Sequence, residues 1–218
     1  YACAQCHSEY YFEPGTNRVV FPWDNGLTAE AMYSLYSTKP NGFEKDWVHG
    51  TSKAPMLKAQ HPDYEEWSTG VHGQSGVSCA DCHMPYMRSD GQKYTSHHMT
   101  SPLQAIQSSC LTCHKQDEAW ALNQVKTIQD SVFAMQQNIA RAHETIAKAA
   151  AQPGANEADL AAARELVRQA QWYWDYVAAA NSMGFHSPVQ AQRNLGQALD
   201  LSYKAIEKAN QAAGRGGF

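Results

Sequence analysis

The sequence predicts a mainly α-helical protein in which an irregular, turn-rich region is followed by long antiparallel helices. Two observations predict this fold. Apolar residues recur every three or four positions through residues 116–213, as expected of long amphipathic helices. Residues 1–115 have few periodic stretches, are punctuated by Gly and Pro, and contain all six cysteines. We therefore divide the chain into a first region, residues 1–115, and a long-helix region, residues 116–218.

Three helices are expected in the long-helix region. Pro153-Gly154 ends the first, Asn156 is the expected N-cap of the second, and Met183-Gly184 ends the second. Ser187 is expected to cap the third, with Pro188 at its first position, and Gly214 closes it. The apolar stripes are Val125, Ile128, Val132, Met135, Ile139, Ala142 and Ile146; Leu160, Ala163, Val167, Ala170, Trp174 and Val177; and Leu195, Leu199, Ser202, Ile206 and Ala209. We interpret them as intramolecular core, although a seam this long can also pair two subunits, so this region is also a candidate dimer interface.

Short helices separated by turns are expected in the first region. The only segment typical of a strand is Arg18–Phe21. The expected turns lie at Pro14-Gly15, Asp24-Asn25-Gly26, Pro40-Asn41-Gly42 and Asp90-Gly91.

Composition excludes two classes of protein. The net charge is −4, and no clustered basic footprint points to nucleic acid. No apolar run approaches the roughly 20 residues of a transmembrane helix. The sequence shows no signal peptide and opens two residues before its first cysteine, so we expect further sequence upstream of Tyr1.

The cysteines form three Cys-x-x-Cys-His motifs that use every cysteine of the chain. They are Cys3, Cys6 and His7; Cys79, Cys82 and His83; and Cys110, Cys113 and His114. This motif is the signature of covalent haem c attachment, in which two thiols bind the porphyrin edge and the adjacent His is the proximal iron ligand. Paired cysteines also build zinc sites, but zinc does not require a His after each pair. A thioredoxin-like redox site has a single pair. We therefore predict three haems on this chain and an extracytoplasmic location.

Seven other histidines are candidates for the second axial position of low-spin haems: His49, His61, His72, His97, His98, His143 and His186. His72 lies between Gly70 and Gly73, where small residues allow close approach of a porphyrin. His186 lies at the junction of two predicted helices. At most one of the adjacent His97 and His98 is expected to face a given haem. We expect His143, among polar residues of a helix, to face solvent, and His49 is not assigned.

Four segments together resemble the ammonia-forming cytochrome c nitrite reductases, which are pentahaem enzymes. They are Cys3-Ala4-Gln5-Cys6-His7-Ser8-Glu9-Tyr10-Tyr11-Phe12, Phe21-Pro22-Trp23-Asp24, Pro55-Met56-Leu57-Lys58-Ala59-Gln60-His61-Pro62 and Gly76-Val77-Ser78-Cys79-Ala80-Asp81-Cys82-His83-Met84-Pro85. The resemblance runs in order along nearly the whole chain. It implies a fold in which haems fill much of the core of the first region.

The resemblance also implies residue roles. Tyr10, His61 and Gln60 would belong to the catalytic pocket. Calcium, which prefers oxygen ligands, would be bound by Glu9 and Gln60 with the main-chain carbonyls of Tyr10 and Lys58. Three axial ligands are implied as well: His72 for the haem of His114, His186 for the haem of His83, and His97 for a haem attached outside this chain.

The chain also departs from the family pattern. The family attaches its catalytic haem through Cys-x-x-Cys-Lys, and this motif is absent from the sequence. We expect that haem, a pocket arginine, a fifth haem motif and the distal ligand for the haem of His7 to lie upstream.

The implied function is six-electron reduction of nitrite to ammonium, in the periplasm, by a homodimer that receives electrons from a cytochrome or quinol dehydrogenase. Membrane association would occur through such a partner. Two alternatives remain open. The first is the core of an octahaem nitrite reductase; one branch of those enzymes has a Cys where this chain has Phe12. The second is a non-catalytic multihaem electron-transfer cytochrome, in which Tyr10 and His61 are ordinary packing residues.

Overall fold

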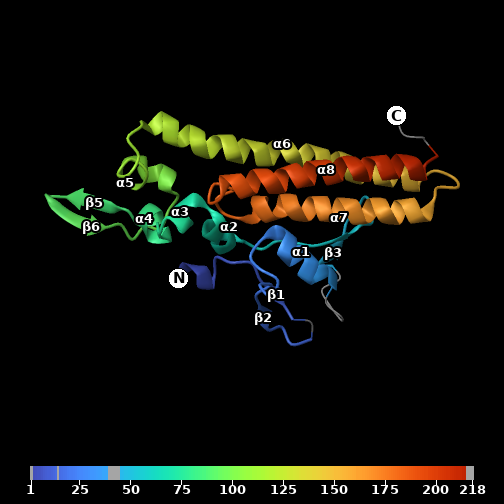
Figure 1. Cartoon of the computed structure of the whole chain (residues 1–218), viewed down its shortest axis with the longest axis horizontal. Helices are drawn as coiled ribbons and strands as arrows, with labels where there is room; N and C mark the ends of the chain where they lie inside the picture. The colour runs from blue at the N-terminus through green and yellow to red at the C-terminus, as the bar shows by residue number, and fades with distance from the viewer. Residues whose placement is uncertain (1, 14, 39–44, 215–218) are drawn as a thin grey trace.

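The computed structural model describes residues 2–13, 15–38 and 45–214, and its longest elements are three helices of the second region. These are α6 (Glu118–Ala150), α7 (Glu157–Ala179) and α8 (Pro188–Ala212). They lie side by side, and consecutive helices run antiparallel (Figure 1). The expected mainly α fold with long C-terminal helices is confirmed.

The ends of these helices follow the predicted signals, with two differences. The Asn156 side chain accepts a hydrogen bond from the Asp159 amide at 3.1 Å, so the predicted N-cap of α7 is confirmed. α7 ends at Ala179, ahead of Met183 and Gly184, which both have positive φ in the following turn. Ser187 occupies the N-cap position of α8 but makes no capping bond. Its Oγ accepts a hydrogen bond from Thr69 at 3.2 Å instead.

Burial corrects the predicted stripes of α7 and α8. In α8 the buried face is shifted, and Leu199 is 37% exposed. In α7, Trp172, Tyr173 and Tyr176 are buried although they lie outside the predicted stripe. The reason is that α7 is covered on two faces, by α6 and α8 on one and by the first region on the other (Figure 1). A single stripe describes a helix with only one buried face.

The first region consists of short elements. The helices are α1 (Ala29–Thr38), α2 (Asp63–Thr69), α3 (Val71–Gln74), α4 (Cys79–His83) and α5 (Ile106–Ser109), with 3₁₀ turns η1 (Cys3–Gln5) and η2 (Pro102–Ala105). The strands are β1 (Tyr11–Phe12), β2 (Val19–Val20), β3 (Trp47–Val48), β4 (Pro55–Met56), β5 (Tyr86–Ser89) and β6 (Gln92–Thr95). They pair as three antiparallel two-stranded ribbons, β1–β2, β3–β4 and β5–β6.

The expectation of a single strand at Arg18–Phe21 is therefore only partly right, since β2 lies within it and five other strands were not predicted. Strands of two or four residues are too short to show alternation in sequence. The turn at Asp90-Gly91 is confirmed, and both residues have positive φ, as a tight hairpin turn requires. The Gly26 amide bonds to the Trp23 carbonyl at 2.9 Å, which confirms the turn at 24–26. The predicted turns at Pro14 and at 40–42 fall outside the described residues.

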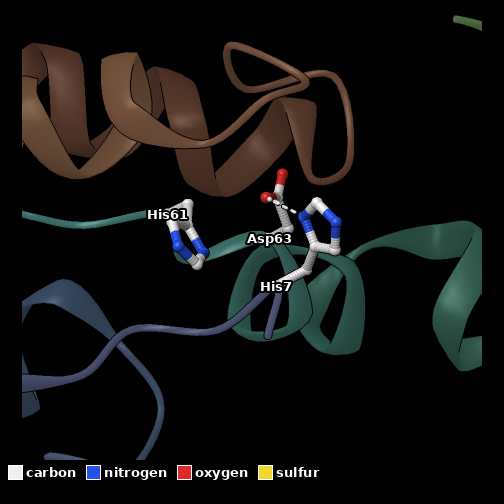
Figure 2. Close-up of side chains that lie close together, drawn as sticks. All are labelled: His7, His61 and Asp63. Carbon is white, nitrogen blue, oxygen red and sulfur yellow. Dashed lines mark hydrogen bonds and ion pairs between the residues drawn. The ribbon is translucent and has the colours of Figure 1, made fainter. Parts of the chain in front are cut away.

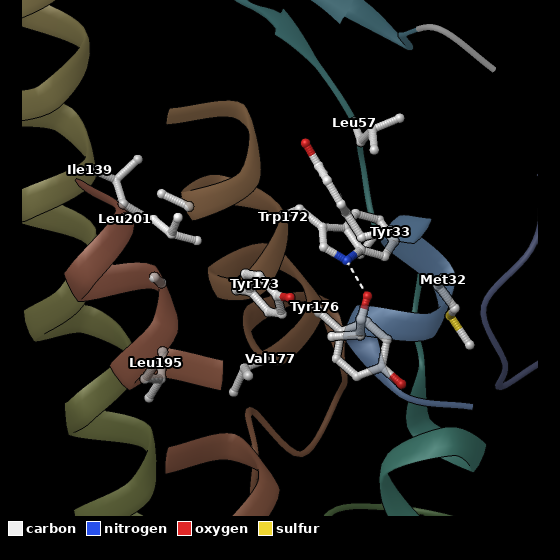
Figure 3. Close-up of a cluster of buried hydrophobic side chains, with 14 of the residues drawn as sticks. Met32, Tyr33, Leu57, Ile139, Trp172, Tyr173, Tyr176, Val177, Leu195 and Leu201 are labelled. Carbon is white, nitrogen blue, oxygen red and sulfur yellow. Dashed lines mark hydrogen bonds between the residues drawn. The ribbon is translucent and has the colours of Figure 1, made fainter. Parts of the chain in front are cut away.

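One hydrophobic core joins the two regions of the chain. Trp172 of α7 donates its indole N–H to the Ala29 carbonyl at 2.8 Å, and the Tyr176 hydroxyl donates to the Leu27 carbonyl at 2.8 Å. Figure 3 shows Met32 and Tyr33 of α1 on one side of Trp172 and Tyr176, and Leu195 and Leu201 of α8 on the other. The division at residue 115 stays a prediction from sequence, and the packing continues across it.

Candidate haem sites and active-site pocket

Each Cys-x-x-Cys-His motif folds as one helical turn. The His7 amide bonds to the Cys3 carbonyl at 2.9 Å, and the His114 amide bonds to the Cys110 carbonyl at 3.0 Å. The third motif forms α4, from Cys79 to His83. Positions three apart in a helical turn share one side, so both thiols of a motif face the same way. This local geometry suits two thioether bonds to one porphyrin edge.

The motifs lie close to one another. Burial raises the pKa of the Cys79 thiol, and the neighbouring Cys3 raises it further. Burial also raises the pKa of Cys82 to about 11, with a second contribution from Cys110. The thiols of the second motif, Cys79 and Cys82, therefore each lie close enough to a thiol of another motif for the two to interact electrostatically. Haems attached at these positions would form a continuous chain of neighbours.

Two predicted pairs of histidines face each other. The ring centroids of His72 and His114 are 6.1 Å apart, and those of His83 and His186 are 6.3 Å apart. Two imidazoles that ligate one metal from opposite sides, through bonds of about 2.0 Å, have centroids roughly 6 Å apart. The residues present therefore fit a six-coordinate haem iron between each pair.

The hydrogen bonds of His83 and the burial of His186 suit ligand roles. His83 Nδ1 lies 3.0 Å from the Thr100 carbonyl oxygen, so with a proton on Nδ1 its Nε2 is free for a metal. Burial lowers the pKa of His186, which favours the neutral imidazole that a metal requires. His97 and His98 are exposed on the segment that follows β6.

The glycines beside His72 have a packing role that the sequence did not indicate, and the close approach of a porphyrin there stays a prediction. A Cβ on Gly70 would lie 1.9 Å from the His186 carbonyl oxygen, and a Cβ on Gly73 would lie 2.1 Å from the Trp67 carbonyl oxygen. Both glycines therefore allow backbone segments to pack closely. Gly70 in particular allows the segment that carries His186 to pack against the junction of α2 and α3.

Tyr10 and His61, the predicted pocket residues, lie together. Their ring centroids are 5.7 Å apart, and the His61 ring lies 5.9 Å from that of His7. The Tyr64 amide bonds to the His7 carbonyl at 3.0 Å, which ties the loop of the first haem motif to the His61 segment. His61 Nδ1 is buried and has no hydrogen-bond partner among the described residues. The Tyr10 phenol and the His61 imidazole thus lie together although 51 positions separate them in the sequence.

Glu9 and Gln60, two of the residues expected to bind calcium, are in direct contact. Glu9 is fully buried, and its Oε2 accepts a hydrogen bond from the Gln60 amide at 2.6 Å. Burial raises the Glu9 pKa well above its usual range, and the charges of Glu65 and Asp175 raise it further. A buried carboxylate among other carboxylates suits a cation with oxygen ligands. The Lys58 ammonium contacts the Ala59 carbonyl and Asp175.

Glu65 organises this part of the pocket and was not predicted as a site residue. Its Oε1 accepts hydrogen bonds from the Glu9 amide at 2.9 Å and from the Trp23 indole at 2.7 Å. Trp23 belongs to the Phe-Pro-Trp-Asp segment quoted above, so the structure gives that segment a role. Burial raises the pKa of Glu65 to about 7. No spacing pattern in the sequence indicates this contact.

Asp63 is a second site residue that sequence reasoning missed. It is 5% exposed and lies beside His7, whose Nδ1 is 3.4 Å from its Oδ2 (Figure 2). Potential ligand atoms of His7, His61 and Asp63 all lie within 4.8 Å of one another. Since His7 belongs to a haem motif and His61 to the pocket, this group is part of the haem site.

His143 contradicts the expectation that it faces solvent. It is 3% exposed, with Nδ1 2.7 Å from Ser52 Oγ and Nε2 2.9 Å from Gln171 Oε1. His49 stacks on it with ring centroids 3.7 Å apart. His143 itself faces the turn between β3 and β4 and helix α7, whereas its polar neighbours Arg141 and Glu144 are exposed, and helical periodicity alone does not reveal this difference. Neither ring lies at a haem motif.

These sites define a multihaem c-type cytochrome with three haem-attachment motifs, one of which places His7 beside the His61 and Tyr10 rings. The profile of the cytochrome c552 family matches residues 1–218, and the chain belongs to that family.

Relatives and a solved structure agree with this assignment. Cytochrome c-552 of Bacteroides thetaiotaomicron is 42% identical over 99% of this chain and 44% of its own length. Cytochrome c-552 of Parabacteroides distasonis is 45% identical over 93% of this chain and 41% of its own length. The catalytic subunit of Desulfovibrio desulfuricans cytochrome c nitrite reductase, which has two calcium sites, matches with a TM-score of 0.87 and 42% identity. That match covers 98% of this chain and 49% of the solved one.

The chain thus spans slightly less than half the length of these relatives. Among the described helices, none combines the length and apolar character needed to cross a membrane.

Proposed function

We propose that this chain is part of a periplasmic cytochrome c nitrite reductase that reduces nitrite to ammonium. The observation that carries the proposal is the pairing of Tyr10 with His61 beside a haem-attachment loop. Both residues lie in the segments that resemble the family most specifically. In the proposed enzyme the haem that binds nitrite is attached outside residues 1–218, since no Cys-x-x-Cys-Lys motif occurs in this sequence.

The reaction determines what the pocket residues must do. Nitrogen passes from the +3 to the −3 state, so nitrite takes up six electrons and eight protons to give ammonium and two waters. Haem c supplies the electrons, one at a time. His61 can donate protons and hydrogen bonds through its imidazole, and Tyr10 offers a hydroxyl as donor or acceptor. Calcium at Glu9 and Gln60 would raise the local positive potential and favour an anion.

Electron delivery is assigned to the other haems. We propose that His72 and His114 ligate one iron, that His186 and His83 ligate another, and that His7 is the proximal ligand of a third. Two observations support these assignments: the spacing of the ring centroids in each histidine pair and the proximity of the three haem motifs. Saturated irons have no open position, so these haems transfer electrons and do not bind substrate. His97 is proposed to ligate a haem attached elsewhere in the whole protein.

Substitution of the pocket residues in the whole enzyme tests the proposal. Tyr10→Phe and His61→Asn should each lower nitrite turnover by about 10²-fold or more while haem content stays unchanged. Tyr94→Phe and His98→Asn, at exposed positions, are the matched controls and should keep full turnover. Wild-type turnover in both pocket variants would instead favour the non-catalytic electron-transfer cytochrome.

One alternative role for His61 follows from the same geometry. Its centroid lies 5.9 Å from that of His7, a spacing that also suits two ligands of one iron. The His61→Asn variant separates the two roles. A new high-spin signal would assign His61 as an axial ligand, whereas unchanged low-spin signals with lost turnover support the pocket role. Mass spectrometry of the intact polypeptide, which counts haems, separates the pentahaem from the octahaem parent.

We also propose a homodimer formed through the long helices. α6 exposes Leu122 and Phe133, and α8 exposes Val189, Leu199 and Tyr203. Exposed large apolar side chains on neighbouring helices are typical of a subunit interface. Phe133→Glu should therefore convert the whole protein to monomer in light scattering, while Tyr94→Glu on the β5–β6 ribbon should not.

A further inference from the structure

Asp63 lies between two histidines that belong to different haem sites. Its Oδ2 is 3.4 Å from Nδ1 of His7, and its Oδ1 is 3.5 Å from Nδ1 of His186. His7 follows Cys6, whereas His186 faces His83, which follows Cys82. A single carboxylate thus faces the Nδ1 atoms of one proximal and one proposed distal ligand.

The position of Asp63 is held by the loop that follows α7. The Asn181 amide donates to Oδ1 at 2.8 Å, and the Asn181 side-chain amide donates to Oδ2 at 2.7 Å. Asp63 is 5% exposed, so water screens it poorly. Both carboxylate oxygens therefore have fixed directions, each toward one imidazole.

Asp63 contacts Nδ1 of both imidazoles, and the Asn181 side-chain amide nitrogen also lies 3.3 Å from Nδ1 of His7. His186 Nδ1 is buried and makes no hydrogen bond with the described residues, and the acidic group nearest to it is Asp63, at an ion-pair distance of 3.5 Å. With Nδ1 directed at Asp63, Nε2 of each ring remains available to a metal. A carboxylate on the outer N–H of an imidazole ligand increases the basicity of that ligand. A more basic ligand with a nearby negative charge favours the ferric state over the ferrous state.

We infer that Asp63 is a positioning residue that lowers the reduction potentials of two haems together, those attached at Cys3/Cys6 and at Cys79/Cys82. This inference rests on the ligand pairs of the proposed function. The His114 ring contacts His72 and Trp120, and no carboxylate contacts either His72 or His114 among the described residues. Asp63 therefore distinguishes two haems of the chain from the third.

Asp63→Asn in the whole holoprotein tests the inference, because Asn keeps the shape and one acceptor oxygen but loses the charge. Potentiometric titration followed by spectra of the individual low-spin haems should show two potentials raised. The expected change is about tenfold in each one-electron reduction equilibrium, which is about 59 mV. The potential of the haem at Cys110/Cys113 should stay unchanged and is the internal control.

Glu66→Gln is the matched control variant. Glu66 is 2% exposed, lies in the same helix and accepts a hydrogen bond from the Ser182 hydroxyl, and it makes no hydrogen bond to an imidazole of the described residues. If Glu66→Gln raises the same two potentials as much as Asp63→Asn does, replacement of any buried carboxyl group of α2 explains the effect and the inference fails. Two unchanged potentials in Asp63→Asn would also overturn it, while persistent low-spin spectra would leave the proposed ligands intact.

If Asp63→Asn does not fold with its haems attached, a measurement on the wild-type protein tests the inference instead. The near-infrared charge-transfer band of a ferric bis-histidine haem reports the basicity of its ligands. Two haems should show bands shifted toward imidazolate character, and the haem at Cys110/Cys113 should not. Bands typical of neutral imidazole at all three haems would contradict the inference.

Discussion

At the scale of single residues, His143 shows how burial changes a side chain's chemistry. Burial lowers its pKa to about 4, and the stacked His49 lowers it as well, whereas the hydrogen bond to Gln171 acts in the opposite direction. Its two nitrogens bind a serine from the β3–β4 turn and a glutamine of α7. The neutral ring has one donor and one acceptor nitrogen, and with them it links α6 to the β3–β4 turn and to α7. A protonated ring has two donors, so it could not accept a hydrogen bond from either partner.

The lowered pKa of His143 predicts that the folded protein loses stability in acid. The unfolded chain has a His pKa near 6.5, so between about pH 6.5 and about 4 it binds more protons than the folded chain. The free energy of unfolding should fall by about 3 kcal/mol as pH decreases through this window. Thermal unfolding of the wild type and His143→Gln across pH checks it.

As the pH falls, the free energy of unfolding of His143→Gln should increase relative to that of the wild type. His98→Gln, at an exposed position, is the control and should track the wild type. A difference between wild type and His143→Gln that is independent of pH would contradict the prediction.

At the scale of elements, the junction of α2 and α3 determines where His186 lies. Gly70 ends α2 and precedes α3, and the His186 carbonyl lies where its Cβ would be. Thr69 also bonds to Ser187, the residue at the N-cap of α8. One short junction therefore positions both the segment that carries His186 and the start of a long helix.

Gly70→Ala should displace this segment and weaken the contact between His186 and the haem of His83. We expect a destabilisation of about 1–3 kcal/mol and a new high-spin haem signal in electron paramagnetic resonance. Gly196→Ala in α8 is the matched control, because an added Cβ there meets no atom within 4 Å. That change should be neutral or stabilising by up to about 1 kcal/mol. A low-spin spectrum identical to wild type in Gly70→Ala would refute the proposed constraint.

At the scale of the whole molecule, a shared core couples the haem-bearing region to the long helices. Trp172 is fully buried and contacts Tyr36 of α1 edge-on, with ring centroids 5.3 Å apart. Its indole also bonds to the first residue of α1. Because these contacts cross the boundary at residue 115, neither region completes its core alone.

Trp172→Ala should therefore destabilise both regions together, by about 3–5 kcal/mol. The Soret band reports the haem region and far-ultraviolet circular dichroism reports the helices, and both should lose their signals at one lowered midpoint. Tyr94→Ala, on the exposed β5–β6 ribbon, should change stability by about 0.5 kcal/mol or less. Separate midpoints for the two signals in the wild type would show that the regions unfold independently.

The sequence alone was sufficient for the haem chemistry and for the long helices. Three Cys-x-x-Cys-His motifs and periodic apolar stripes are local signals, since both depend on residues within a few positions of one another. The family resemblance, in turn, singled out Tyr10 and His61, and the fold placed their rings in contact.

Tertiary structure decided what depends on distant segments. The burial of His143, the second buried face of α7, the role of Gly70 and the contacts of Asp63 all arise between residues far apart in the chain. No local pattern encodes such contacts, because the partner of each group is chosen by packing. Asp63 lies between His7 and His186 only in the folded protein, where α2 contacts the loop that follows α7.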